Sequence, residues 1–359
     1  MSLEFRELNL AASAASYRHL FSDAFPEKVG SSIATEAHYR WKFFHQPGPV
    51  RPCAFGAYAE EALAGFYGSI PLGYRIGGEA ITAALICDVM TMSHMRGRGV
   101  FTRLGQYALD QMQHAGIHMC MGYPIRAEVI PGHLKVGWRI LFALPIYLKI
   151  LHTREILQKW RAQSLAPAAD LCLRAYWLAS SLLRSPHNDV QASLTTADAL
   201  LMRSDLSSFL EMWSVQTTNC LVRTVEFLRW RTSAPEVAVD AVIAERASRI
   251  AGIALARSAE VKGVHLMTVL DFLPHDAGDS VAPALHKGLD ELAFKKGASG
   301  LALMTTPERA REWRLFENGY VRSPFAYKFI VRWLAGHEMP PTVGDRRAWH
   351  LTWLDTDCF

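Results

Sequence analysis

The chain has 359 residues, of which 50% are apolar, 20% charged and 11% aromatic, and its formal net charge is +4. This apolar fraction excludes a mainly disordered chain, and the length suits two domains better than one core. The 38 Lys and Arg residues are spread thinly among 34 Asp and Glu residues, so nucleic acid is not an expected partner.

The cysteines and the apolar runs indicate where such a chain would work. None of the six cysteines forms a CxxC pair, so no disulfide framework is expected. Glu4, Arg6 and Glu7 lie where a signal peptide would be apolar. The most apolar run, residues 136–151, is interrupted by charged residues and proline and is too short to span a bilayer. We therefore expect a cytoplasmic protein without an integral membrane segment.

Hydrophobic patterning and turn residues predict the elements of the first 150 residues. Two helices are expected, followed by a hairpin that turns at Glu60 and Glu61. A second turn at Gly77 and Gly78 then leads to a long strand that needs a bend or bulge. A helix ended by glycine and a short apolar strand come next. In order, these elements cover residues 11–25, 34–45, 53–59, 62–76, 80–92, 100–114 and 118–123. A meander followed by a βαβ unit indicates a mixed α/β sheet.

A weak internal repeat indicates the domain organisation. Asp88, Pro124 and Arg126 recur 183 positions later as Asp271, Pro307 and Arg309, and the Trp41 segment resembles the segment around Trp230. We therefore expect two copies of one domain, at 1–151 and 190–359. Residues 152–189 would be a helical linker, with two helical stretches packed between the copies. An alternative places this linker on a membrane surface through Trp160, Tyr176 and Trp177.

The sharpest local feature is the segment MRGRGVFTRL at 95–104, which follows an apolar strand and opens a helix. Backbone amides that converge at a helix N-terminus can bind a pyrophosphate. Gly97 and Gly99 would let the backbone approach the ligand, and Arg96 and Arg98 would add charged hydrogen bonds. The alternative is a plain strand–turn–helix with two exposed arginines.

This turn, with the strands and helix around it, resembles the acyl-CoA-binding core of the GNAT superfamily of N-acetyltransferases. Residues 96–100 fit its pattern (Gln/Arg)-x-x-Gly-x-(Gly/Ala), whereas Phe101 departs from the last small position, as in the branch with an RGxGxF turn. The segment YRWKFFHQPGP at 39–49 is similar to a segment of tandem GNAT proteins found with bacterial exopolysaccharide and cell-envelope genes. The resemblance implies two tandem GNAT-like domains.

The resemblance also implies where the donor binds. Acetyl-CoA, or a related thioester, would lie between strands 85–92 and 118–123, against Met90, Thr91, Met92, Arg96, Gly97, Arg98, Gly99, Val100, Phe101 and Thr102. In the second copy, residues 274–285 replace the arginines with His275, Asp276 and Asp279. Carboxylates would repel a pyrophosphate, so the second copy is expected to be degenerate and to serve structure, acceptor binding or domain pairing.

Three residues are candidates for catalysis by this resemblance. Asp88 would hold or deprotonate the acceptor amine, and His133 or Tyr123 would protonate the departing thiolate. The alternative for Asp88 is a structural carboxylate bonded to backbone or to an arginine. The alternative for His133 is a histidine on the surface of a helix. No metal site is expected.

The favoured function is transfer of an acetyl or short acyl group from acyl-CoA to a small-molecule amine, such as an amino sugar or envelope-polysaccharide precursor. The alternative is a non-catalytic module that binds CoA or a partner in polysaccharide assembly. A transferase that uses charged tRNA is disfavoured by the phosphate-binding turn and by the lack of a basic patch. Homo-oligomerisation is left open.

Overall fold

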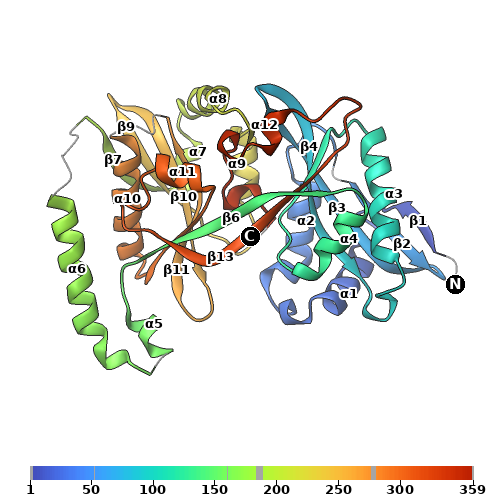
Figure 1. Cartoon of the computed structure of the whole chain (residues 1–359), viewed down its shortest axis with the longest axis horizontal. Coiled ribbons are helices and arrows are strands. Elements are labelled where there is room, and N and C mark those ends of the chain that lie inside the picture. Colours follow the sequence, from blue (N-terminus) through green and yellow to red (C-terminus); the bar gives the residue numbers. More distant parts are fainter. Residues whose placement is uncertain (1–2, 52, 160, 183–188, 276–279, 358–359) are drawn as a thin grey trace.

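The protein, described here by a computed structural model, is built on one continuous sheet (Figure 1). The structure describes residues 3–51, 53–159, 161–182, 189–275 and 280–357. The sheet has 13 strands in the order β1-β2-β3-β4-β5-β13-β6-β12-β11-β10-β9-β7, and β8 pairs with β3. The mixed α/β fold class predicted from the sequence is confirmed.

The first half of the chain forms one end of the sheet. Its elements are β1 (Glu4–Glu7), α1 (Ala14–Ala24), α2 (Glu36–Phe44), β2 (Cys53–Ala59), β3 (Ala62–Ile76), β4 (Glu79–Thr91), α3 (Val100–His114), β5 (Met119–Gly122) and α4 (Ile130–Lys135). The predicted turns are present, because Glu60, Glu61, Gly77 and Gly78 all have positive φ angles. The helix α3 ends next to Gly116, whose φ is +79°, as the sequence predicts.

The second half repeats much of this succession at the other end of the sheet. Its elements are β7 (Gln191–Thr196), α7 (Ala197–Leu201), α8 (Leu206–Gln216), β8 (Cys220–Leu221), α9 (Val225–Thr232), β9 (Asp240–Arg246), β10 (Arg249–Glu260), β11 (His265–Pro274), α10 (Val281–Lys295), β12 (Gly300–Met304), α11 (Pro307–Glu312) and α12 (Pro341–Gly344). Short 3-10 helices lie at 26–28, 32–34, 93–95, 127–129, 163–165, 346–348 and 353–355, the last being η7 (Trp353–Asp355).

Two long strands join the two ends of the sheet. The strand β6 (Arg139–Ile150) leaves the first half and pairs with β12, with Leu148 opposite Ala302. The strand β13 (Val321–Trp333) pairs with β5, with Val331 opposite Met121. The two strands also pair with each other and cross the middle of the molecule (Figure 1). Each half therefore completes its sheet with a strand from the other half.

The linker packs differently from our expectation. Its helices α5 (Arg154–Gln158) and α6 (Ala166–Leu182) lie at the outer end of the second half, not between the halves (Figure 1). The Glu155 carboxylate accepts hydrogen bonds from the amide of His265 and the hydroxyl of Ser299, both at 2.8 Å. The reason is the course of β6, which carries the chain across to β12 before the linker begins. Side chains at 174 and 176–182, and Trp160, lie outside the described residues.

The faces of the sheet in the first half carry different helices. Phe66 points toward α1, where Tyr17 contacts it with ring centroids 5.0 Å apart. The next residue, Tyr67, points to the opposite face, where α3 packs and His133 of α4 lies. This alternation is the usual period of a strand. Among the described residues, no helix is both long and apolar enough to cross a membrane.

Candidate functional site

The turn that opens α3 offers a set of free backbone amides. Gly97 and Gly99 have φ angles of +76° and +75°, and Gly99 is the N-cap of α3. Within the described part of the chain, the amides of residues 97–102 donate to no main-chain carbonyl. A Cβ at Gly97 would meet no atom within 4 Å, so the turn is open to a ligand. Unpaired amides at a helix N-terminus fit a pyrophosphate.

Side chains on both sides hold this turn in place. Asp23 of α1 accepts hydrogen bonds from the amide and hydroxyl of Ser93, at 2.6 and 2.8 Å, and these bonds lower the pKa of Asp23. Arg96 is exposed, and its Nε donates to the carbonyl of Thr91 at 3.3 Å. Arg98 is also exposed. Sequence reasoning missed the contribution of Asp23, because it depends on a contact between distant segments.

The departure at Phe101 has a packing explanation. A Cβ built on Gly132 of α4 would lie 2.5 Å from the ring of Phe101, so the glycine makes room for that ring. Val100 is buried and packs over Gly65, where a Cβ would lie 3.0 Å from it. The Thr102 hydroxyl donates to the carbonyl of Gly99 at 3.1 Å. These contacts fix the first turn of α3 on α4 and β3.

Beside this turn the sheet opens between two parallel strands. The strands β4 and β5 pair only from Ala83–Met119 to Leu85–Met121. The strand β4 then continues to Thr91, whereas β5 ends at Gly122, so residues 86–91 are unpaired on that side. Met90 is buried, and the Thr91 hydroxyl is buried without a partner in the described chain. Met92 is partly buried. This opening fits the predicted path of a thioester arm.

Asp88 lies at the bulge that the sequence predicts in β4. Phe66 faces Met90 but Gly68 faces Cys87, so Asp88 falls in the register shift, with a φ of +51°. Its carboxylate accepts hydrogen bonds from Lys42 Nζ at 3.0 Å and from the Tyr17 hydroxyl at 2.9 Å. Burial is the largest single influence and lowers the pKa of the Lys42 ammonium, but Asp88, Cys87 and Asp357 together outweigh it and raise that pKa.

More polar groups surround this ion pair. His38 lies one helical turn before Lys42, and Arg231 and Asp357 approach from α9 and from the C-terminal segment. Burial raises the pKa of the Asp357 carboxyl, and Lys42 acts against that rise. No local pattern indicates this cluster, because its members are up to 319 positions apart (38 to 357).

Tyr123 follows β5 and lies on the same face as Asp88. It packs in the core cluster that contains Tyr17, and it stacks on Phe329 with centroids 5.3 Å apart. Its hydroxyl is buried and has no hydrogen-bond partner among the described residues. Burial raises its pKa, and the neighbouring Tyr74 adds to this effect, so Tyr123 stays protonated at neutral pH.

His133 lies on the opposite face of the sheet. Its ring makes edge contacts with Phe101 and Trp138, with centroids 5.0 and 4.9 Å away. The side chain is only 5% exposed, so our alternative of a surface histidine is wrong. Phe101 reaches back onto α4 and Trp138 follows that helix, so together they cover the ring. Burial lowers the pKa of His133 to about 4, which leaves it neutral at pH 7.

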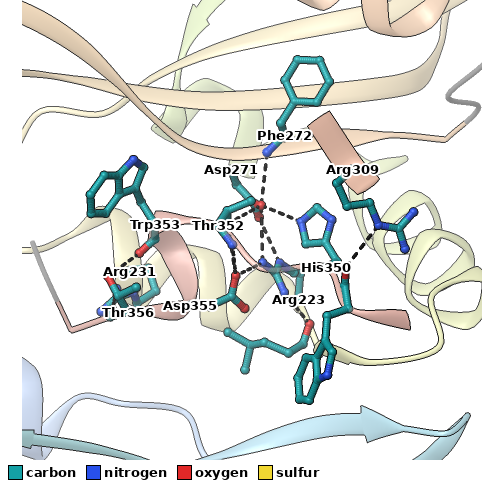
Figure 2. Close-up of polar contacts among 12 residues, drawn as sticks. Arg223, Arg231, Asp271, Phe272, Arg309, His350, Thr352, Trp353, Asp355 and Thr356 are labelled. Carbon is teal, nitrogen blue, oxygen red and sulfur yellow. Dashed lines mark hydrogen bonds and ion pairs between the residues drawn. The ribbon is translucent and has the colours of Figure 1, made fainter. Parts of the chain in front are cut away.

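The aspartate at the matching position of the second half is locked in a buried network (Figure 2). Asp271 accepts hydrogen bonds from Arg223 Nε at 3.0 Å, His350 Nε2 at 3.1 Å and the Thr352 hydroxyl at 3.0 Å. Arg223 also contacts Asp355 at 2.9 Å. Burial alone would raise the pKa of Asp271, but Arg223 and His350 hold it well below its ordinary value. Asp271 is therefore the carboxylate bonded to an arginine, whereas Asp88, for which that alternative was considered, is bonded to Lys42 and Tyr17. Asp276 and Asp279 lie outside the described residues.

Comparisons with known proteins cover both the sequence and the fold. Residues 4–141 match the family model described as the acetyltransferase (GNAT) domain. No curated protein matches the chain significantly.

Solved structures share the fold along nearly the whole chain. A GCN5-related N-acetyltransferase from Anabaena variabilis is similar with a TM-score of 0.64 and 12% identity, covering 92% of this chain and 73% of that one. Saccharomyces cerevisiae N-myristoyltransferase with bound myristoyl-CoA gives 0.59 and 10%, covering 92% and 78%. Eis1 from Mycobacterium abscessus gives 0.55 and 14%, covering 93% and 74%.

Proposed function

We propose that the protein is an N-acyltransferase that moves an acetyl or short acyl group from acyl-CoA to a small-molecule amine. The observation that carries the proposal is the turn at 96–102, where free amides open α3 beside the gap between β4 and β5. The GNAT domain match over residues 4–141 supports acyl-CoA as the donor. We also propose a cytoplasmic location, where such donors are found.

The donor would supply an activated carbonyl and a thiolate leaving group, and this chain would supply position and proton transfer. The amides and arginines of the turn would hold the pyrophosphate. Asp88 would orient the acceptor amine and take its proton. Tyr123 is our preferred proton donor to the thiolate, because it is protonated at neutral pH whereas His133 is not. Lys42 and Tyr17 would position the Asp88 carboxylate.

We further propose that the halves are two copies of one domain, 1–151 and 190–359, joined by the segment 152–189. The repeated succession of elements and the matching positions of Asp88 and Asp271 support this division. In the second copy, Asp271 accepts hydrogen bonds from Arg223 and His350 and is not available for catalysis. This supports a role of the second copy in structure or in shaping the acceptor site. The acceptor would bind on the α2 side of β4, facing α9.

The acceptor in this proposal is an amine such as an amino sugar or an envelope-polysaccharide precursor, for which the segment at 39–49 is the support. The alternative is a CoA-binding module without catalysis. To separate them, acetyl-CoA and a panel of amines would be incubated with the protein, and release of the CoA thiol would be followed. Amine-dependent release that is lost in Asp88→Asn supports the enzyme. Binding of acetyl-CoA without release from any amine supports the module.

A further inference from the structure

A buried imidazole without a partner lies beside the proposed acceptor site. His38 is 3% exposed, and its ring makes no hydrogen bond among the described residues, although its nitrogens are not fully enclosed. The ring contacts Trp41 with centroids 5.0 Å apart. Burial lowers its pKa to about 3, and the charges of Lys42 and Arg231 act in the same direction. His38 is therefore neutral at pH 7 and can donate one hydrogen bond and accept another. Because the ring nitrogens keep some accessible surface and make no hydrogen bond within the described chain, they are available to a ligand.

Charges of both signs surround this imidazole. Lys42 and Asp88 form the ion pair at 3.0 Å, with side chains 6% and 9% exposed. Arg231 enters from α9, with its guanidinium 5.2 Å from the ring centroid of Trp230, and donates to the carbonyl of Thr356 (Figure 2). Asp357 follows that residue and interacts electrostatically with Lys42, Asp88 and Arg231.

The charge balance of this cluster decides which acceptor it can hold. Two cationic and two acidic side chains cancel when all are ionised. A bare ammonium would leave one uncompensated positive charge in a buried place, which is expensive. An acceptor that carries an acid beside its amine adds no net charge, and each of its ends meets a side chain of opposite sign.

We propose that the cluster of His38, Lys42 and Asp88 binds an acceptor whose amine lies next to an anionic group, as in an α-amino acid or an amino-sugar phosphate. The inference rests on the proposed function and names its substrate class. The amine would contact Asp88 and Tyr17, and the acid would contact Lys42 and the His38 N–H. In the absence of an acceptor, Lys42 and Asp88 neutralise each other.

The test compares matched pairs of amines that differ only in the acid. Phenylalanine is compared with 2-phenylethylamine, tryptophan with tryptamine, and glucosamine 6-phosphate with glucosamine. Thiol release from acetyl-CoA gives kcat/KM for each, and calorimetry in the presence of CoA gives binding without turnover. We expect the acid-bearing member of at least one pair to be preferred by about 10- to 100-fold, as a charged hydrogen bond allows. A preference in the first two pairs would indicate an amino-acid acceptor, and a preference in the third would indicate an amino-sugar phosphate.

Variants connect the preference to named residues. Lys42→Met should reduce the preference to about 3-fold or less, mainly through KM, while Lys42→Arg keeps it. His38→Leu should raise KM for the acid-bearing member alone, and His38→Gln, which retains hydrogen-bonding atoms, should restore it. Lys42→Met leaves Asp88 without its counter-charge and could fail to fold. In that case His38→Leu and His38→Gln still test the proposal.

Three outcomes would overturn the inference in different ways. If acetyl-CoA binds and the amines without an acid are bound or acetylated equally well, the substrate class is wrong and the proposed function stands. If acetyl-CoA does not bind at all, the proposed function fails and the inference fails with it. An unchanged preference in both Lys42→Met and His38→Leu would also contradict the assignment to this cluster.

Discussion

Trp41 of α2 and Trp230 of α9 stack with ring centroids 5.3 Å apart, and each indole N–H donates to the carbonyl of the other residue. The two hydrogen bonds are 2.7 and 2.9 Å long. Both residues are almost fully buried. This reciprocal contact joins the two halves near the cluster around Asp88, because Lys42 and Arg231 are the next residues in each helix.

The pair should therefore couple the stability of the two halves. A double-mutant cycle with Trp41→Phe and Trp230→Phe should give a coupling free energy of about 1–2 kcal/mol, from the stacking and the shared hydrogen bonds. Urea unfolding would measure it. Trp333→Phe is a suitable control, because Trp333 is partly exposed and donates only to the nearby carbonyl of His337. Additive effects of Trp41→Phe and Trp230→Phe would contradict the coupling.

Asp88 should affect turnover and stability separately. Asp88→Asn should lower kcat about 100-fold or more, as expected for loss of a general base, without changing the affinity for CoA. It should also destabilise the fold by roughly 3–5 kcal/mol, because Lys42 loses its counter-charge.

The double variant Asp88→Asn/Lys42→Met separates these effects, since it removes both charges. We expect it to regain most of the stability but none of the turnover. Asp110→Asn, at an exposed position of α3, is the control and should leave both unchanged. Recovery of turnover in the double variant would show that Asp88 serves only the ion pair.

His133 should make the fold sensitive to acid. Its pKa is about 4 in the folded chain, below the ordinary value of 6.5. The unfolded chain therefore binds the proton first as pH falls, and stability is lost between about pH 6.5 and 4. The shift corresponds to on the order of 3 kcal/mol. In urea unfolding, His133→Leu should lose less stability than the parent over this range. Equal losses would contradict the buried neutral state.

The network around Asp271 should support the fold but not the chemistry. Arg223→Met leaves two buried carboxylates, Asp271 and Asp355, without their main counter-charge and should cost about 3–5 kcal/mol. The exposed pair of Arg18 and Glu36, 3.7 Å apart, provides the control, and Arg18→Met should cost about 1 kcal/mol or less. Because the pKa of Asp271 is held low, its contribution is present at neutral pH and declines as pH falls below about 4. A fold unaffected by Arg223→Met would contradict this account.

Local patterns predicted much of the fold. The glutamate and glycine turns, a bulge in the long strand β4 and the turn at Gly97 and Gly99 all depend on residues close in sequence, so period and turn chemistry indicate them. The exchange of β6 and β13 was not predictable, because strand pairing between residues such as Leu148 and Ala302 leaves no local trace. The linker helices were predicted to lie between the halves, and they lie at the outer end of the second half because of that exchange.

The candidate site shows the same division. The turn at Gly97 and Gly99 could be predicted from the sequence, because glycine readily adopts the positive φ angles that both residues have. The partners of Asp88 could not, because Tyr17 and Lys42 come from helices 71 and 46 positions away. Asp88 and His133 lie on opposite faces of the sheet, which neighbouring side chains of β3 define by pointing to alternate sides. This alternation predicts the placement of the two residues only when it is known which helices pack on each face.

The most direct test of the account is a calorimetric titration of acetyl-CoA into the parent protein, Gly99→Glu and Gly116→Glu. Gly99 and Gly116 lie at opposite ends of α3, with φ angles of +75° and +79°, so a side chain strains the backbone similarly at each. We expect one equivalent to bind the parent and Gly116→Glu, and none to bind Gly99→Glu. Absence of binding to the parent, or equal binding to both variants, would contradict a donor site at the N-terminus of α3.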